Sequence, residues 1–144
     1  MSIQQEIKSQ LAKLLATEDL IVEHKQVETA SFNVETRVLV LPLWEKASSE
    51  VYDMLVAHEV GHALFTPCED WIDRYPEIPP SFVNIVEDAR IEKLMKRKYA
   101  GLPKTFFTGY KELQGMDFFK LSGIDVNEMG IADRLNLYFK IGNF

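Results

Sequence analysis

The segment from Glu50 to Phe65 constrains the fold more than any other part of the chain. Its apolar residues fall on all sides of a helical projection: Val51, Met54, Leu55, Val56, Ala57, Val60, Ala63, Leu64 and Phe65. A helix that is apolar all round is buried, so we expect a core helix here that other elements surround. Ser48 and Ser49 offer an N-cap, and Pro67 stops the helix.

The same segment contains His58-Glu59-Val60-Gly61-His62, which has the form H-E-x-x-H. Residues four apart lie on one face of a helix, so both imidazoles can reach one metal ion. Glu59 lies beside them, where it can take a proton from a metal-bound water. Because polar side chains on a buried helix need a common explanation, the motif predicts a zinc site with Glu59 as catalytic base. Gly61 lowers helix propensity by about 1 kcal/mol, which predicts that another backbone packs closely there.

A catalytic zinc ion usually takes three protein ligands and a water, so one more ligand is expected. The helix that we expect at 81–99 offers it. Glu87 lies on an apolar stripe of that helix, among Val83, Ile91 and Leu94. A carboxylate on such a stripe must be paired or bound to a metal. We therefore predict Glu87 as the third ligand, with Asp88 as the main rival and an ion pair between Glu87 and Arg90 as the structural alternative.

Other residues are weaker candidates for the third ligand. Cys68 follows His62 by six residues, where the extended motif H-E-x-x-H-x-x-G-x-x-H has its third histidine. The glycine that turns the chain in that motif is replaced here by Phe65. His24 is the only other histidine, and isolated histidines of this kind are mostly surface or capping residues.

Supporting roles fall to polar residues near the motif. Asn84, Asp88 and Glu92 are candidates to orient an imidazole through its free N–H. Possible donors to an oxyanion are Arg90, Tyr99 and Tyr110, and the sequence does not choose among them.

The remaining pattern predicts an α+β fold, mostly helical, with a small sheet packed on the motif helix. Residues 2–16 have an amphipathic helical stripe of Ile3, Ile7, Leu11, Leu14 and Leu15. Residues 29–41 are typical of two short strands with a turn at 35–36, the second strand at 37–41. Further helices are expected at 104–113 and 127–140, with Gly142 as a cap, whereas 17–28 are ambiguous and 66–80 form a loop. We expect one domain over 1–144.

Composition narrows the class of protein. The net charge of −6 argues against a nucleic-acid or anionic-membrane surface. The start of the chain lacks the layout of a signal peptide, and no apolar run approaches the ~20 residues of a membrane span. A single cysteine excludes an intrachain disulfide, so an intracellular protein is expected.

These motifs together resemble a known group. His58, Glu59 and His62, with a glutamate on a downstream helix, look like the zincin metallopeptidases of the gluzincin type. Segments 58–64 and 84–92, with the strand region 30–42, are similar to metallopeptidase-like regions of tailed-phage and bacterial proteins related to the cobaltochelatase T subunit. Such a region is commonly followed there by a von Willebrand A domain, so the resemblance implies that a partner domain can follow this one.

The resemblance implies a zinc-dependent metallopeptidase of zincin-like fold, acting on a peptide or protein in the cytoplasm, or in the host cytoplasm or virion if the chain comes from a phage. His58, His62 and Glu87 would bind Zn²⁺, and Glu59 would be the general base. In zincins an edge strand holds the extended substrate, and the strand at 37–41 is expected to do so here. The alternative is a non-catalytic zinc-binding scaffold in a phage or ATPase-linked assembly. Only two histidines and one clear carboxylate are available as ligands, which leaves a fourth metal position open and favours catalysis.

Overall fold

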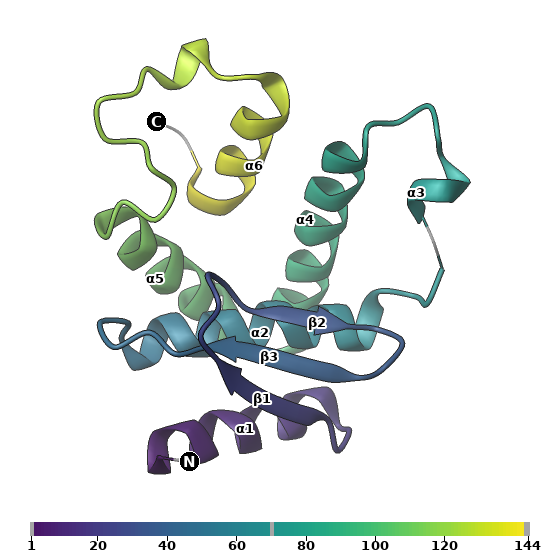
Figure 1. Cartoon of the computed structure of the whole chain (residues 1–144), viewed down its shortest axis with the longest axis vertical. Coiled ribbons are helices and arrows are strands. Elements are labelled where there is room, and N and C mark those ends of the chain that lie inside the picture. The colour runs from purple at the N-terminus through teal and green to yellow at the C-terminus, as the bar shows by residue number, and fades with distance from the viewer. Residues whose placement is uncertain (1, 70, 143–144) are drawn as a thin grey trace.

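The computed structural model describes residues 2–69 and 71–142 and has the expected α+β architecture (Figure 1). Its helices are α1 (Ile3–Ala16), α2 (Ser49–Phe65), α3 (Trp71–Arg74), α4 (Pro80–Lys98), α5 (Leu102–Gly115) and α6 (Ile131–Ile141), with a 3-10 turn at Val126–Glu128. Its strands are β1 (Ile21–Lys25), β2 (Ser31–Asn33) and β3 (Val38–Pro42).

Helix α2 is the centre of the fold, as its all-round apolar sequence predicted. Val51, Val56, Ala57 and Val60 are completely buried on it. Helices α1, α4 and α5 and strands β2 and β3 all contact α2. The Ser48 hydroxyl accepts a hydrogen bond from the backbone N–H of Val51, so the expected N-cap is confirmed.

The sheet has the strand order β1-β3-β2. β1 runs parallel to β3, with Ile21 opposite Val38, and β2 pairs antiparallel with the other side of β3. The strand expected at 37–41 is therefore central, and the prediction that it forms an edge was wrong. The ambiguous segment 17–28 supplies β1, which covers the outer side of β3 and leaves β2 as the edge strand next to α2.

Helix α1 forms where expected, but most of its apolar stripe stays exposed, and only Leu11 and Leu15 of the stripe pack half-buried against the core. Ile3, Ile7 and Leu14 are 80%, 57% and 75% exposed. The buried face instead holds Lys8, Ser9, Ala12 and Ala16. The small alanines let α1 approach its neighbours closely, and the buried Lys8 ammonium donates to Ser49 Oγ and Asp53 Oδ1 at 2.7 and 2.5 Å on α2.

Two glycines set how closely the helices around α2 pack. A Cβ atom at Gly61 would lie 2.7 Å from Ile91 Cδ1 and 3.1 Å from Met95 Cγ on α4. The close approach expected at Gly61 is therefore present, although side chains rather than backbone make it. Gly109 on α5 approaches Met54 of α2 in the same way.

Smaller differences concern helix ends. Helix α4 begins at Pro80 without a side-chain cap, although Ser81 was the expected N-cap. The last helix was expected from Asn127, but its first turn is the 3-10 turn and α6 begins at Ile131. Gly142, at φ 78°, ends α6 as predicted, and its N–H donates to Tyr138 O. Within the described ranges, no helix has the length and apolarity needed to cross a membrane.

Candidate metal centre

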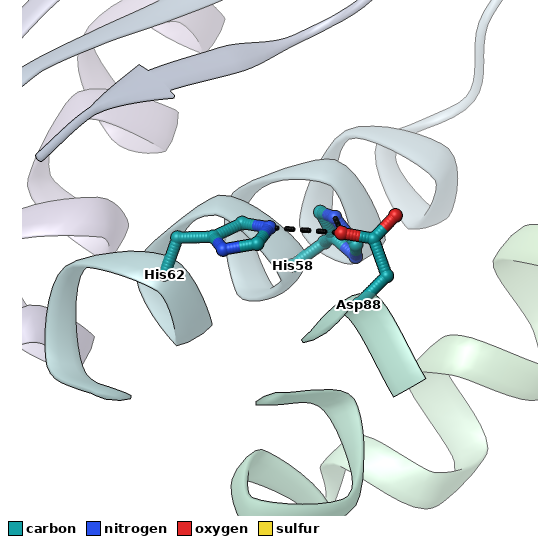
Figure 2. Close-up of side chains that lie close together, drawn as sticks. All are labelled: His58, His62 and Asp88. Carbon is teal, nitrogen blue, oxygen red and sulfur yellow. Dashed lines mark hydrogen bonds and ion pairs between the residues drawn. The ribbon is translucent and has the colours of Figure 1, made fainter. Parts of the chain in front are cut away.

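Helices α2 and α4 bring three potential metal ligands together (Figure 2). Asp88 Oδ1 lies 3.1 Å from His62 Nε2 and 3.5 Å from His58 Nε2. The three ligand atoms all lie within 4.8 Å of one another. Both histidines occupy one face of α2 because they are four residues apart, and α4 turns Asp88 toward them.

The spacing of these atoms fits a metal ion. Zinc binds imidazole nitrogen and carboxylate oxygen at about 2.0–2.2 Å, so two ligand atoms of a tetrahedral site lie about 3.3 Å apart. The two distances to Asp88 Oδ1, 3.1 and 3.5 Å, lie on either side of this value. Each imidazole can therefore share one ion with the Asp88 carboxylate, and the three ligand atoms lie within 4.8 Å of one another.

Glu87 does not join the histidines, which corrects the expected ligand set. Its carboxylate accepts two hydrogen bonds from Arg90, at 2.7 and 2.8 Å, and one from the Thr66 hydroxyl at 2.7 Å. Neighbouring helical residues point about 100° apart, so Asp88 is directed at the histidines while Glu87 reaches only Thr66 at the end of α2. The face of α4 that packs on α2 carries Ile91, Glu92 and Met95. Asp88 shares this face because it lies one turn before Ile91 and Glu92.

Glu92 has the orienting role that the sequence suggested. Its Oε1 lies 2.8 Å from His58 Nδ1. The Tyr110 hydroxyl, from α5, donates to the same oxygen. Burial and the Glu92 carboxylate raise the pKa of Tyr110 well above its usual value, so the phenol stays a donor. Since Glu92 is only 4% exposed, this pairing fixes the His58 ring with Nε2 directed at the candidate metal position.

The opposite charges of the histidines and the carboxylates at the site shift each other's pKa values. Burial lowers the pKa of His58, but hydrogen bonds to Asp88 and Glu92 and the charge of Glu59 outweigh it and raise the pKa to about 10. Burial raises the pKa of Asp88, yet its bonds to His58 and His62 hold that pKa well below the usual range. The three carboxylates around the two imidazoles therefore make a site that favours a cation.

Glu59 is buried next to the histidines, only 8% exposed. Burial raises the pKa of its carboxyl, against the lowering effect of His58 and His62. No hydrogen bond within the described residues ties up this carboxylate. It is therefore free to bind and release a proton beside the candidate metal position.

A cleft of about 1090 Å³ opens onto these residues. Residues 29–35, which include β2, line it together with the three candidate ligands and Glu59. Arg37 ties the β2–β3 hairpin to α2 by donating to Ala63 O at 2.8 Å, one residue after His62. The edge strand and the candidate metal centre thus share one cavity.

Strand β2 has backbone polar groups at the free edge of the sheet. Arg37 O accepts from the Ile21 N–H, and the Leu43 N–H donates to Lys25 O, so the residues of β3 between them that face β2 are Val38 and Val40. Val38 pairs with Asn33, so the polar groups of Asn33 face β3. In an antiparallel pair these directions alternate, so the N–H and C=O of Phe32 point away from β3. Phe32 therefore presents one donor and one acceptor at the free edge.

The other candidate residues do not join the group of three ligands. His24 Nε2 lies 3.1 Å from Ser9 Oγ on α1, and Cys68 is exposed outside the ligand triad. Tyr99 donates to Leu15 O at 2.6 Å, which gives it a structural role. Arg90 is engaged by Glu87 and by Phe65 O at 2.6 Å.

Two site residues were missed in the sequence. Lys140 of α6 places Nζ 3.9 Å from Asp88 Oδ2, the oxygen that faces away from the histidines. Thr66 Oγ1 lies 2.8 Å from His62 Nδ1. The sequence near Lys140 does not indicate a contact with Asp88, because the two residues are 52 positions apart. Thr66, in contrast, follows His62 by four residues, so helical spacing could have predicted their contact.

Comparison of the chain with protein-family models, with curated proteins and with solved structures found no match. Its function is therefore inferred from the geometry of the site.

Proposed function

We propose that this protein is a zinc-dependent metallopeptidase with a zincin-like fold. The observation that carries the proposal is the convergence of His58 Nε2, His62 Nε2 and Asp88 Oδ1 beside the buried carboxylate of Glu59. Two imidazoles and one carboxylate are a usual ligand set for catalytic zinc, which keeps a fourth position for water or substrate. Asp88 replaces Glu87 as the proposed third ligand.

Each side chain then has a defined task. His58, His62 and Asp88 would hold the ion, which when bound supplies Lewis acidity toward water and a carbonyl group. The Glu59 carboxylate accepts a proton from the attacking water and returns it to the leaving amine. Burial of Glu59 keeps competing solvent away from this transfer.

Strand β2 lines the cleft and can bind an extended substrate. An extended peptide in the cleft can pair with the N–H and C=O of Phe32, which adds a strand to the free edge of the sheet. Such pairing recognises the peptide backbone independently of its side chains. It therefore favours an extended segment of a polypeptide over a compact small molecule.

The alternative of a purely structural zinc site is less well supported. A structural site usually closes all four positions with protein ligands. Among the described residues, the group that can hold a metal comprises only His58, His62 and Asp88. A structural site also gives no reason for a buried Glu59 carboxylate that accepts no hydrogen bond from the described residues.

Metal binding is tested by zinc content and by calorimetric titration of the metal-free protein. We expect one zinc ion per parent chain, loss of stoichiometric zinc in Asp88→Ala, and retention in Glu87→Gln. The exposed Glu45→Gln serves as a matched control. Retention of full zinc by Asp88→Ala with loss in Glu87→Gln would restore Glu87 as the ligand, and a parent chain without zinc affinity would refute the site.

Catalysis is tested with the zinc-loaded chain and a quenched fluorogenic peptide library. Glu59→Gln should keep the zinc but lose at least about 1000-fold in kcat/KM, because the general base is gone. Glu45→Gln should cleave like the parent. Equal cleavage by Glu59→Gln rules out the base role. A zinc-loaded parent that cleaves no library member leaves the scaffold alternative in its place.

A further inference from the structure

The side chains of Thr66 and Glu87 form a chain of hydrogen bonds that ends on His62. His62 Nδ1 lies 2.8 Å from Thr66 Oγ1, and Thr66 Oγ1 lies 2.7 Å from Glu87 Oε1. Thr66 is the C-cap residue of α2, one turn after His62, and Glu87 belongs to α4. The chain therefore links the two helices that carry the candidate ligands.

The number of available protons determines which atom donates in each of these hydrogen bonds. Glu87 accepts two hydrogen bonds from the Arg90 guanidinium, so its carboxylate is an acceptor. The single hydroxyl proton of Thr66 points to Glu87. The Thr66 oxygen is then left to accept, and His62 Nδ1, at 2.8 Å, supplies the N–H among the residues that the structure describes. With its proton on Nδ1, the neutral His62 ring has its lone pair on Nε2, which lies 3.1 Å from Asp88 Oδ1, the other candidate ligand atom.

We infer that Thr66 and Glu87 are positioning residues that hold His62 in the Nδ1–H form required for metal binding through Nε2. This inference rests on the proposed metal site but does not require that the protein be a peptidase. It also gives Glu87 a role in metal binding different from that of a ligand.

Arg90 completes the arrangement. Besides its two bonds to Glu87, it donates to Phe65 O at 2.6 Å, in the last turn of α2. The guanidinium thus fixes Glu87 relative to the same turn that carries Thr66. On the other side of the site, Tyr110 and Glu92 hold His58 in the same manner. Each histidine is therefore oriented through Nδ1 by a carboxylate of α4, directly for His58 and through a hydroxyl for His62.

The test compares Thr66→Val with Thr66→Ser. Valine keeps the shape of threonine without the hydroxyl, whereas serine keeps the hydroxyl. We expect Thr66→Val to bind zinc about 10–100-fold more weakly than the parent, which is the usual effect of losing an orienting partner. Thr66→Ser should stay within about threefold, and Glu87→Gln should lie between the two. Thr105→Val, on α5, is the matched control and should bind like the parent.

A spectroscopic readout separates orientation from general damage. In the zinc-loaded parent, proton–nitrogen NMR should detect a His62 Nδ1–H that is protected from solvent exchange, and Thr66→Val should lose this protection. Parent-like zinc affinity in Thr66→Val overturns the inference while the metal site stands. So does a Thr66→Ser variant as weak as Thr66→Val. Absence of zinc binding by the parent, in contrast, refutes the metal site itself.

Discussion

Substitution of Gly109 by alanine tests the packing that holds the site together. Gly109 is buried where α5 crosses α2, and a Cβ atom there would lie 2.5 Å from Met54 Cβ and 2.8 Å from Met54 Cγ. Carbon atoms in good contact lie about 3.5–4.0 Å apart, so the gap is at least about 1 Å too small.

The magnitude follows from what can move. Met54 Cβ is fixed to the backbone of α2, and its side chain is almost completely buried, so rotation cannot relieve the overlap. The two helices must separate, and overpacking of this kind costs about 1–3 kcal/mol. Alanine recovers about 1 kcal/mol through its higher helix propensity. The difference between these two effects leaves a loss of up to about 2 kcal/mol in the free energy of unfolding of Gly109→Ala, and of up to about 6 °C in Tm.

The assay is urea unfolding of the metal-free protein, with calorimetry for Tm. Gly115→Ala is the matched control, because Gly115 ends the same helix and a Cβ there meets nothing within 4 Å. This variant should be as stable as the parent or slightly more stable. A free energy of unfolding for Gly109→Ala at or above that of the parent would refute the reasoning.

Two further predictions concern the metal centre. Tyr110→Phe removes the buried donor to Glu92. It should destabilise the metal-free protein by about 2 kcal/mol and weaken zinc binding about tenfold. Urea unfolding and zinc titration measure these two effects, with Tyr138→Phe, at an exposed position, as control. Unchanged values would show that Tyr110 does not support Glu92. Zinc at 100 times its dissociation constant should add about 2.7 kcal/mol of stability, or about 5–10 °C in Tm, and a chelator should reverse the gain. A Tm that does not change with added zinc contradicts the proposed ligand set. A zinc-dependent rise in the Tm of Asp88→Ala similar to that of the parent contradicts it too.

The features that depend on local sequence were predictable. Helix α2 and its burial follow from its composition, and the relation of His58 to His62 follows from the helical repeat. Ser48 as N-cap and Gly142 as the end of α6 also depend on neighbouring residues alone. For the same reason the hairpin of β2 and β3 was predictable from its alternating pattern and short turn.

The features that depend on distant contacts were decided by the tertiary structure. Glu87 and Asp88 are adjacent on α4, and the choice between them depends on which side of that helix packs on α2. An apolar stripe alone indicated Glu87, but the packed face follows Ile91, Glu92 and Met95 and therefore selects Asp88. In the same way the buried side of α1 was decided by distant contacts. Lys8 is buried because its ammonium donates to Ser49 and Asp53 on α2. The sequence of α1 alone favoured burial of Ile3 and Ile7, which are exposed.

The amino-acid sequence by itself thus determined a buried helix that carries two histidines and a glutamate. The crossing of α4 over α2 decided which carboxylate joins them, and the pairing of β1 with β3 decided which strand borders the cleft. The physical reason is the same in each case. Helical and strand periodicity fix directions within one element, whereas the side on which elements meet is set by the total packing of the fold.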